Sequence, residues 1–112
     1  MLDRILRMGK TMFEGEVIWL TSEQGGRTTG PPTADEYRAT GYVPPHNVQD
    51  GLASFWLREF VPGQWRSPAR AWWLAVENAG PQELRPGSVV VVTEGARPVA
   101  YFHVDEIRSG DA

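Results

Sequence analysis

The sequence predicts an all-β protein, a six-stranded closed antiparallel β-barrel. Two observations support this class: short segments in which apolar and polar residues alternate, and turn residues that separate these segments at intervals of about eight to twelve positions. A chain of 112 residues fits one domain. We expect an N-terminal tail over residues 1–12, the barrel over residues 13–107 and a C-terminal tail over residues 108–112.

The first predicted strand begins at Phe13 and runs into a polar turn. Its alternation is typical of a half-buried strand, and the residues expected on one face are Phe13, Gly15, Val17 and Trp19. Gly25 and Gly26 then allow positive φ without a clash at Cβ, and Arg27 follows them directly. This turn has two interpretations: a structural loop with a solvated arginine, or a recognition loop whose guanidinium meets an anionic group.

The second predicted strand is Tyr37–Val43, which is rich in aromatic and β-branched residues. Glycine and two prolines make residues 29–36, before this strand, a loop. Pro44 closes the strand, because proline cannot donate a hydrogen bond to a sheet. Asp50 and Gly51 form a pair that favours a tight turn into the next strand.

The third predicted strand is Leu52–Phe60. The residues that share one of its faces are Ala53, Phe55 and Leu57. Trp56 belongs to the opposite face, where we expect it to be partly exposed. Pro62 and Gly63 end the strand, and residues 64–68 are expected to form a loop.

The fourth predicted strand is Arg70–Glu77. A helix is the alternative, since alanine, leucine and glutamate favour helices, but the short length and the nearby Pro68 favour a strand. The residues on one side are Trp72, Leu74 and Val76. Trp73 faces the opposite side from Trp72, so we expect at least one of these two tryptophans near the surface.

The last two strands are joined by a hairpin. Ser88–Thr93 contains four consecutive valines, and β-branched side chains pack well in a pleated sheet. Residues 94–98 are expected to form the hairpin loop. Val99–Ile107 is expected to be the sixth strand.

Composition limits the function. The net charge is −3 and the pI is about 5.3, so the strongly basic footprint of many nucleic-acid-binding proteins is absent. The chain has no cysteine, which excludes disulfides and thiolate metal sites and agrees with a cytoplasmic location. No segment approaches the ~20 apolar residues of a membrane span. No phosphate-binding P-loop motif occurs either, so we expect neither membrane nor nucleotide binding.

No group of residues indicates catalysis or a metal centre. His46 and His103 lack the further ligands that a metal site requires, so we predict no metal and no cofactor. His103 and Asp105 share a strand face, as do Glu14 and Glu16, but no motif marks a nucleophile beside either pair. We interpret both pairs as solvated surface residues and predict that the protein is not an enzyme.

Several short motifs, taken in order, resemble the third domain of elongation factor Tu. They are Gly25-Gly26-Arg27, Gly41-Tyr42-Val43-Pro44, Pro86-Gly87 and Glu94-Gly95-Ala96-Arg97. The resemblance spans residues 13–107, and it extends to small standalone bacterial proteins that consist of this barrel alone. It implies a barrel of six strands. The chain departs from the family pattern at Val43, where the family has arginine.

In the elongation factor this barrel helps to hold aminoacyl-tRNA, packs on the GTP-binding domain and meets the exchange factor. The resemblance therefore implies that Arg27 and Gly95 touch RNA backbone. The neighbours expected to share that surface are Gly25, Gly26, Thr28 and Arg97. Our first functional hypothesis is a non-enzymatic, translation-factor-like module that binds tRNA, other RNA backbone or a translation component.

The alternative is a protein-interaction module of the immunity or decoy type. Trp65 precedes Arg66 in a predicted loop, and an exposed tryptophan there would make a hot spot for a protein partner. Salt distinguishes the two hypotheses, because RNA binding weakens steeply as the salt concentration rises and binding through tryptophan does not.

Overall fold

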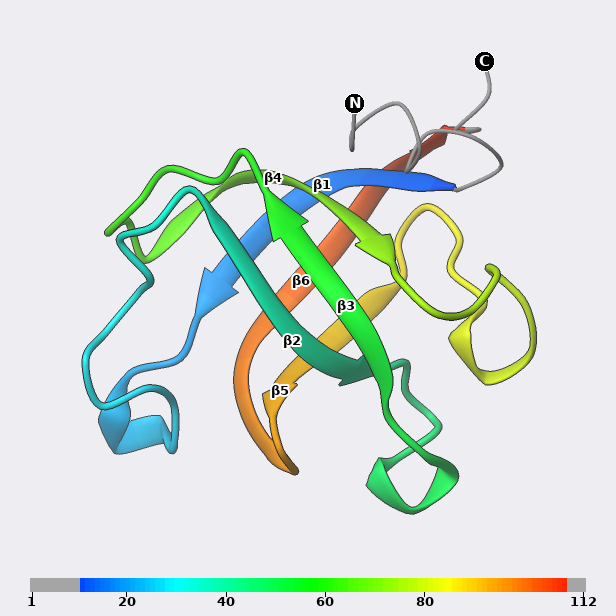
Figure 1. Ribbon diagram of the computed structural model, residues 1–112, viewed down its shortest axis with the longest axis horizontal. Helices are drawn as coiled ribbons and strands as arrows, with labels where there is room; N and C mark the ends of the chain where they lie inside the picture. The colour runs from blue at the N-terminus through cyan, green and yellow to red at the C-terminus, as the bar shows by residue number, and fades with distance from the viewer. Residues whose placement is uncertain (1–10, 109–112) are drawn as a thin grey trace.

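The structure confirms the predicted fold class. The computed structural model describes residues 11–108, and these form a closed barrel of six antiparallel strands in the order β1-β4-β3-β2-β5-β6 (Figure 1). The strands are β1 (Met12–Trp19), β2 (Glu36–Tyr42), β3 (Ala53–Arg58), β4 (Arg66–Trp73), β5 (Val89–Glu94) and β6 (Arg97–Arg108). Three short 3-10 turns accompany them: η1 (Ser22–Gln24), η2 (Val48–Asp50) and η3 (Gly80–Gln82). Most of the two predicted tails, residues 1–10 and 109–112, lies outside the described residues.

β1 closes the barrel, because it pairs with β4 along one edge and with β6 along the other. Phe13 and Val17 are fully buried and Trp19 is nearly so, as the alternation predicts. Gly15 lies between them, beside an irregularity in the β1–β6 register. A Cβ at Gly15 would lie 1.8 Å from the carbonyl oxygen of His103, so only glycine lets β6 approach β1 this closely.

Aromatic and valine side chains fill the interior. Phe55 is fully buried, and its ring centroid lies 4.8 Å from that of Trp73 and 5.8 Å from that of Phe102. Inclined ring pairs of this kind stabilise a core beyond the area that they bury. Val90 and Val92 of β5 complete the same cluster, as the run of valines predicts.

β4 occupies a different part of the chain from the predicted fourth strand. It spans Arg66–Trp73 instead of Arg70–Glu77, so residues that were predicted to form a loop contribute its first half. The prediction placed Pro68 in a loop before the strand, whereas the structure places it within β4. β3 pairs only with Arg70 to Trp73, which leaves Pro68 in a part of β4 that has β1 alone as its neighbour. A proline is tolerated in such an edge-like position, since no second strand requires its missing N–H.

The tryptophans of β3 and β4 are more buried than the sequence predicts. Trp73 lies inside the barrel and Trp72 outside it, yet their exposed fractions are only 2% and 6%. Trp56, which was expected to be partly exposed, is 1% exposed. Its ring packs beside Trp72, and the guanidinium carbons of Arg38 and Arg58 lie 5.2 and 5.0 Å from its centroid. The prediction for Trp56 was wrong because arginine side chains cover its outward-facing ring. Trp72 faces outward, but it packs beside Trp56 and is buried as well.

Antiparallel pairing in a closed barrel gathers the loops at two rims. β1, β3 and β5 end, and β2, β4 and β6 begin, at the same rim (Figure 1). We call it the Arg27 rim, and it consists of the loops at residues 20–35, 59–65 and 95–96. The loops at residues 43–52 and 74–88 form the opposite rim. Within residues 11–108, no helix has the length and apolar character needed to cross a membrane.

Phe55→Ala tests the position of this ring at the centre of the core. We expect the substitution to lower the free energy of unfolding by about 3–5 kcal/mol, because it removes a buried ring and leaves a cavity. The measurement is urea denaturation. Gln64→Ala, at an exposed loop position, is the control and should change the free energy by less than about 0.5 kcal/mol. A loss below about 1 kcal/mol for Phe55→Ala would contradict this packing.

Candidate functional site

Short-range hydrogen bonds hold the turn that follows β1. The side chain of Thr21 accepts from the N–H of Gln24 at 3.2 Å, and the side chain of Gln24 accepts from the N–H of Thr21 at 2.9 Å. Gly25 ends η1 with φ of 90°, a left-handed conformation that favours glycine. Gly26 is buried, and a backbone carbonyl oxygen would lie 2.3 Å from a Cβ added there. The two glycines thus permit the tight turn from which Arg27 reaches the barrel.

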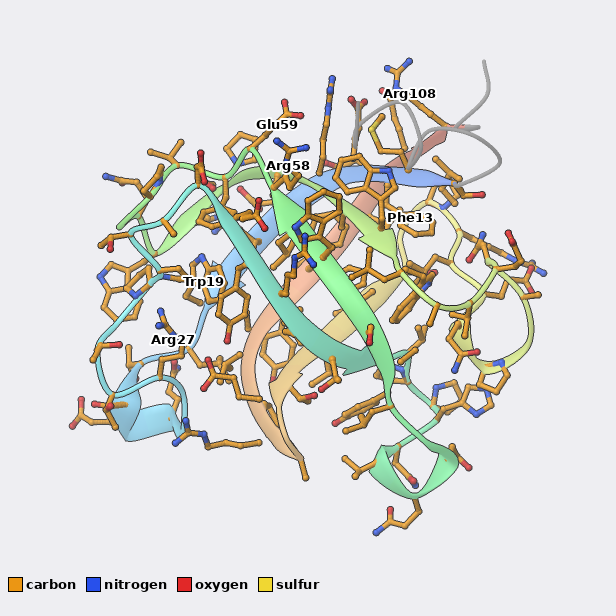
Figure 2. The ribbon with its side chains drawn as sticks, in the orientation of Figure 1. Phe13, Trp19, Arg27, Arg58, Glu59 and Arg108 are labelled. Carbon is orange, nitrogen blue, oxygen red and sulfur yellow. The ribbon has the colours of Figure 1, made fainter. Side chains whose placement is uncertain are left out.

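The side chain of Arg27 is bound to the protein itself. Its Nε donates to Oε2 of Glu94 at 3.2 Å, and its Nη1 donates to the carbonyl oxygen of Gly30 at 2.8 Å. Its guanidinium carbon lies 5.4 Å from the ring centroid of Tyr37, and the side chain is 23% exposed. Figure 2 shows Arg27 at the end of the barrel where β1 terminates. The arginine is therefore neither free in solvent nor held open for an anion.

Glu94, which the sequence analysis named only as part of a hairpin motif and gave no role, is the centre of this cluster. Its Oε2 also accepts a hydrogen bond from the hydroxyl of Tyr37, and its Oε1 accepts one from Nη2 of Arg97 at 3.3 Å. Burial raises the pKa of Glu94, but the Tyr37 hydrogen bond and the charges of Arg27 and Arg97 together hold it below its ordinary value. Burial and the bond to Glu94 raise the pKa of Tyr37 far above its ordinary value. The cluster therefore keeps the carboxylate ionised and the phenol protonated.

The β5–β6 hairpin brings further predicted residues to the same place. Gly95 has φ of 60° in the turn, and the hydroxyl of Thr40 donates to its carbonyl oxygen at 3.4 Å. Arg97 is half-exposed and pairs with Glu94. Glu94 binds Arg27 and Arg97 and directly precedes Gly95, so these three predicted residues lie around it. Its role in holding them depends on contacts between distant parts of the chain.

A groove of about 470 Å³ begins at this hairpin and follows the outer side of β2. The residues that line it are Arg38, Ala39, Thr40, Ser54, Leu74, Thr93, Glu94 and Gly95. The hydroxyl oxygens of Thr40 and Thr93 are 2.6 Å apart, so a hydrogen bond joins them in the groove. The groove adds polar groups beside the turn at Gly95.

Trp65 and Val61 are the exposed apolar side chains of the Arg27 rim, with exposed fractions of 47% and 49%. We call them the Trp65 patch. The backbone of Trp65 is held in place, because the carbonyl oxygen of Trp65 accepts a hydrogen bond from the backbone N–H of Trp19 at 2.9 Å. The indole lies against Gly30, where an added Cβ would be 3.8 Å from the ring. As the sequence predicts, a tryptophan is presented to solvent here.

The predicted binding surface around Arg27 and the predicted binding surface around Trp65 meet at Gly30. Arg27 donates a hydrogen bond to its carbonyl oxygen, and Trp65 packs against its backbone. The predicted binding residues that the Arg27 rim collects are Gly25, Gly26, Arg27, Thr28, Trp65, Gly95 and Arg97. Thr28 is exposed among them. Closure of the barrel thus turns three separate loops into one surface.

Arginine side chains pair with carboxylates across this protein. The pairs include Arg27–Glu94, Arg38–Glu36, Arg66–Glu16, Arg70–Glu14, Arg85–Glu83, Arg97–Glu94 and Arg108–Glu14. Exposed pairs contribute little to stability, but an anionic ligand would have to compete with the carboxylate that each of these arginines already contacts. Arg27 and Arg97 share Glu94, and the loops of the same rim carry three further carboxylates, Glu23, Asp35 and Glu59. The Arg27 rim is therefore not a basic patch.

Within residues 11–108, the His, Asp and Glu side chains form no group of three or more that could hold a metal ion. His46 lies on the opposite rim, with Nδ1 3.7 Å from a carboxylate oxygen of Asp50. His103 is exposed on β6. Glu14 and Glu16 are paired with arginines of neighbouring strands, which agrees with their interpretation as surface residues.

Comparison of the chain with protein-family models and with curated proteins finds no match. The fold and the rim define its class as a small six-stranded antiparallel barrel with an exposed tryptophan patch. Its function is therefore argued from its own residues.

Arg27→Ala tests the structural role of this arginine. We expect the substitution to lower the free energy of unfolding by about 1–3 kcal/mol, because it removes one of the three donors to a partly buried carboxylate and the side-chain donor to the carbonyl oxygen of Gly30. Arg97→Ala removes a half-exposed partner of the same carboxylate and should lower it by less than about 1 kcal/mol. Urea denaturation at pH 7 measures both. An Arg27→Ala protein as stable as the wild type would contradict the role.

Glu94→Gln tests the ionised carboxylate through its pH dependence. The pKa of Glu94 in the folded state lies below the unfolded value of about 4.3. Its contribution to stability is therefore fully present above the unfolded pKa and is lost as the pH falls through the folded pKa. We expect the wild type to exceed Glu94→Gln in free energy of unfolding at pH 7, with a difference that shrinks from about pH 5 to pH 3. A difference that stays constant over that range, in urea denaturation, would disprove the assignment.

Proposed function

We propose that this protein is a non-enzymatic binding module that docks a protein partner through the Trp65 patch. The observation that carries the proposal is the pair of exposed apolar side chains, Trp65 and Val61, on one short loop. Tryptophan is enriched among the residues that dominate the binding energy of protein interfaces. The lack of cysteine supports a cytoplasmic site of action.

The patch is supported by the core of the barrel. Trp19 donates its backbone N–H to the carbonyl oxygen of Trp65, and Trp19 is itself buried. Its ring packs edge-on against Tyr37 and Phe60, with centroids 5.1 and 5.8 Å away. A side chain on an ordered backbone loses less conformational freedom when a partner binds, so more of its burial contributes to affinity.

Charge favours a protein partner over RNA. Phosphate binding would draw Arg27 away from Glu94 and leave a partly buried carboxylate without its main cation. RNA affinity depends strongly on the number of phosphates that a protein neutralises, and this chain has a net charge of −3. A module that occupies another protein, of the immunity or decoy type, does not require an open basic surface.

A second candidate is contact with tRNA, with other RNA backbone or with a translation component. The resemblance to the third domain of elongation factor Tu implies it, and with it a bacterial source. One observation favours this candidate: the Arg27 turn and the Gly95 hairpin, which the resemblance assigns to one RNA surface, meet at Glu94. The hydroxyl-bearing groove beside Gly95 supplies polar groups that suit a sugar–phosphate chain.

Trp65→Ala tests the first proposal. We expect immobilised wild-type protein to retain a protein partner from an extract of its source cells. Trp65→Ala should weaken that binding at least about tenfold, because truncating a hot-spot residue costs about 2 kcal/mol or more. Mass spectrometry identifies the partner, and a photo-crosslinking amino acid at Val61 shows whether the same protein touches the patch.

Tyr101→Ala is the matched control, because Tyr101 is an exposed aromatic residue on the side of the barrel, in β6. This variant should retain the partner as the wild type does. Suppose instead that an RNA is retained at low salt and released steeply as the salt rises. If Arg27→Ala also loses that RNA while Trp65→Ala keeps it, the protein proposal is overturned and the second candidate gains support.

A further inference from the structure

We infer that the segment bound by the Trp65 patch carries a lysine or arginine beside an apolar side chain. This inference rests on the proposed function and adds the chemical class of the partner. It comes from the charges that surround the patch on the Arg27 rim.

The carboxylates of Asp35 and Glu59 lie just beyond the end of the β2–β3 ladder, in the direction of the Trp65 patch. The ladder ends with Glu36 opposite Arg58, and a backbone hydrogen bond of 2.9 Å from Gly63 joins the two segments again further along. Asp35 and Glu59 lie between these two points, in neighbouring segments, and both are exposed. Figure 2 shows the Glu59 side chain pointing away from the barrel.

The uncompensated charge of the rim loops is negative. These loops contain one arginine, Arg27, and three carboxylates, Glu23, Asp35 and Glu59. Arg27 is already in an ion pair, and Glu59 has a partner in Arg70 at 3.4 Å. Glu23 and Asp35 are exposed, and neither forms an ion pair within the described residues. Arg66, which directly follows Trp65, is itself paired with Glu16 at 2.9 Å. The unpaired charge of the rim loops therefore favours a cationic ligand over an anionic one.

Trp65 and the unpaired carboxylates of Glu23 and Asp35 lie on the same rim, which suits a ligand with a cationic side chain. The face of the Trp65 ring attracts an ammonium or guanidinium group, and the exposed carboxylates of the rim loops add a longer-range electrostatic attraction. Val61 offers apolar surface to a neighbour of that cation. An acidic segment would instead meet like charge, which disfavours it as a partner.

Three synthetic peptides of equal apolar content test the inference. Each has the core Leu-X-Leu-X between serine and glycine residues, with X as lysine, glutamine or glutamate. Each is titrated into the isotope-labelled full chain, and binding is followed by NMR at the backbone amides of residues 59–61 and 63–65 and at the indole N–H of Trp65. That indole signal is identified by its loss in Trp65→Phe. We expect the lysine peptide to shift these signals and to bind about two- to fivefold more tightly than the glutamine peptide, with the glutamate peptide weakest.

Charge variants locate the effect. Glu23→Gln combined with Asp35→Asn should reduce the affinity of the lysine peptide to that of the glutamine peptide. Glu77→Gln is the matched control, because Glu77 is exposed and lies on the opposite rim. It should leave all three affinities unchanged.

The outcomes separate this inference from the proposed function. Equal binding of the lysine and glutamine peptides at Trp65, or tighter binding of the glutamate peptide, overturns the inference and leaves the proposed function standing. A lysine peptide that shifts no signal of residues 59–65 also overturns the inference. The proposed function is decided separately, by retention of the partner with Trp65→Ala.

Discussion

Closure of the barrel by β1 is the constraint on which the rest of the structure depends. β1 pairs with β4 and β6 at the same time, and Gly15 allows the backbone of His103 to come close enough for that double pairing. Once the sheet is closed, the ends of six strands meet at two rims. Arg27 and Glu94, 67 residues apart in the chain, can then form an ion pair.

That ion pair decides what the rim can offer to another molecule. Glu94 uses its carboxylate to bind two arginines and a tyrosine hydroxyl, so the guanidinium of Arg27 is engaged within the protein. An anionic ligand would have to compete with this carboxylate, whereas an apolar or cationic partner would not. The exposed Trp65 patch, next to the same loop, can be covered by another molecule without breaking the Arg27–Glu94 ion pair.

The sequence could name members of the candidate site but not their roles. Arg27 and Trp65 were identified because glycine turns and loop tryptophans are visible in a sequence, and Gly95 was named through the family resemblance; all three lie on one rim. Glu94 and Tyr37 were given no role in the site, since they meet across 57 residues and no local spacing in the sequence indicates such a contact. Whether these residues bind a partner stays a prediction.

The sequence by itself determined the strand content and most of the inward faces. Alternation along β1 and the four valines of β5 specify these features locally, because successive side chains of a strand point to opposite sides. Only the tertiary structure decided the position of β4, the burial of Trp56 and the engagement of Arg27. Each of these depends on which groups other strands place against the residue, and pairing partners and covering side chains come from distant parts of the chain.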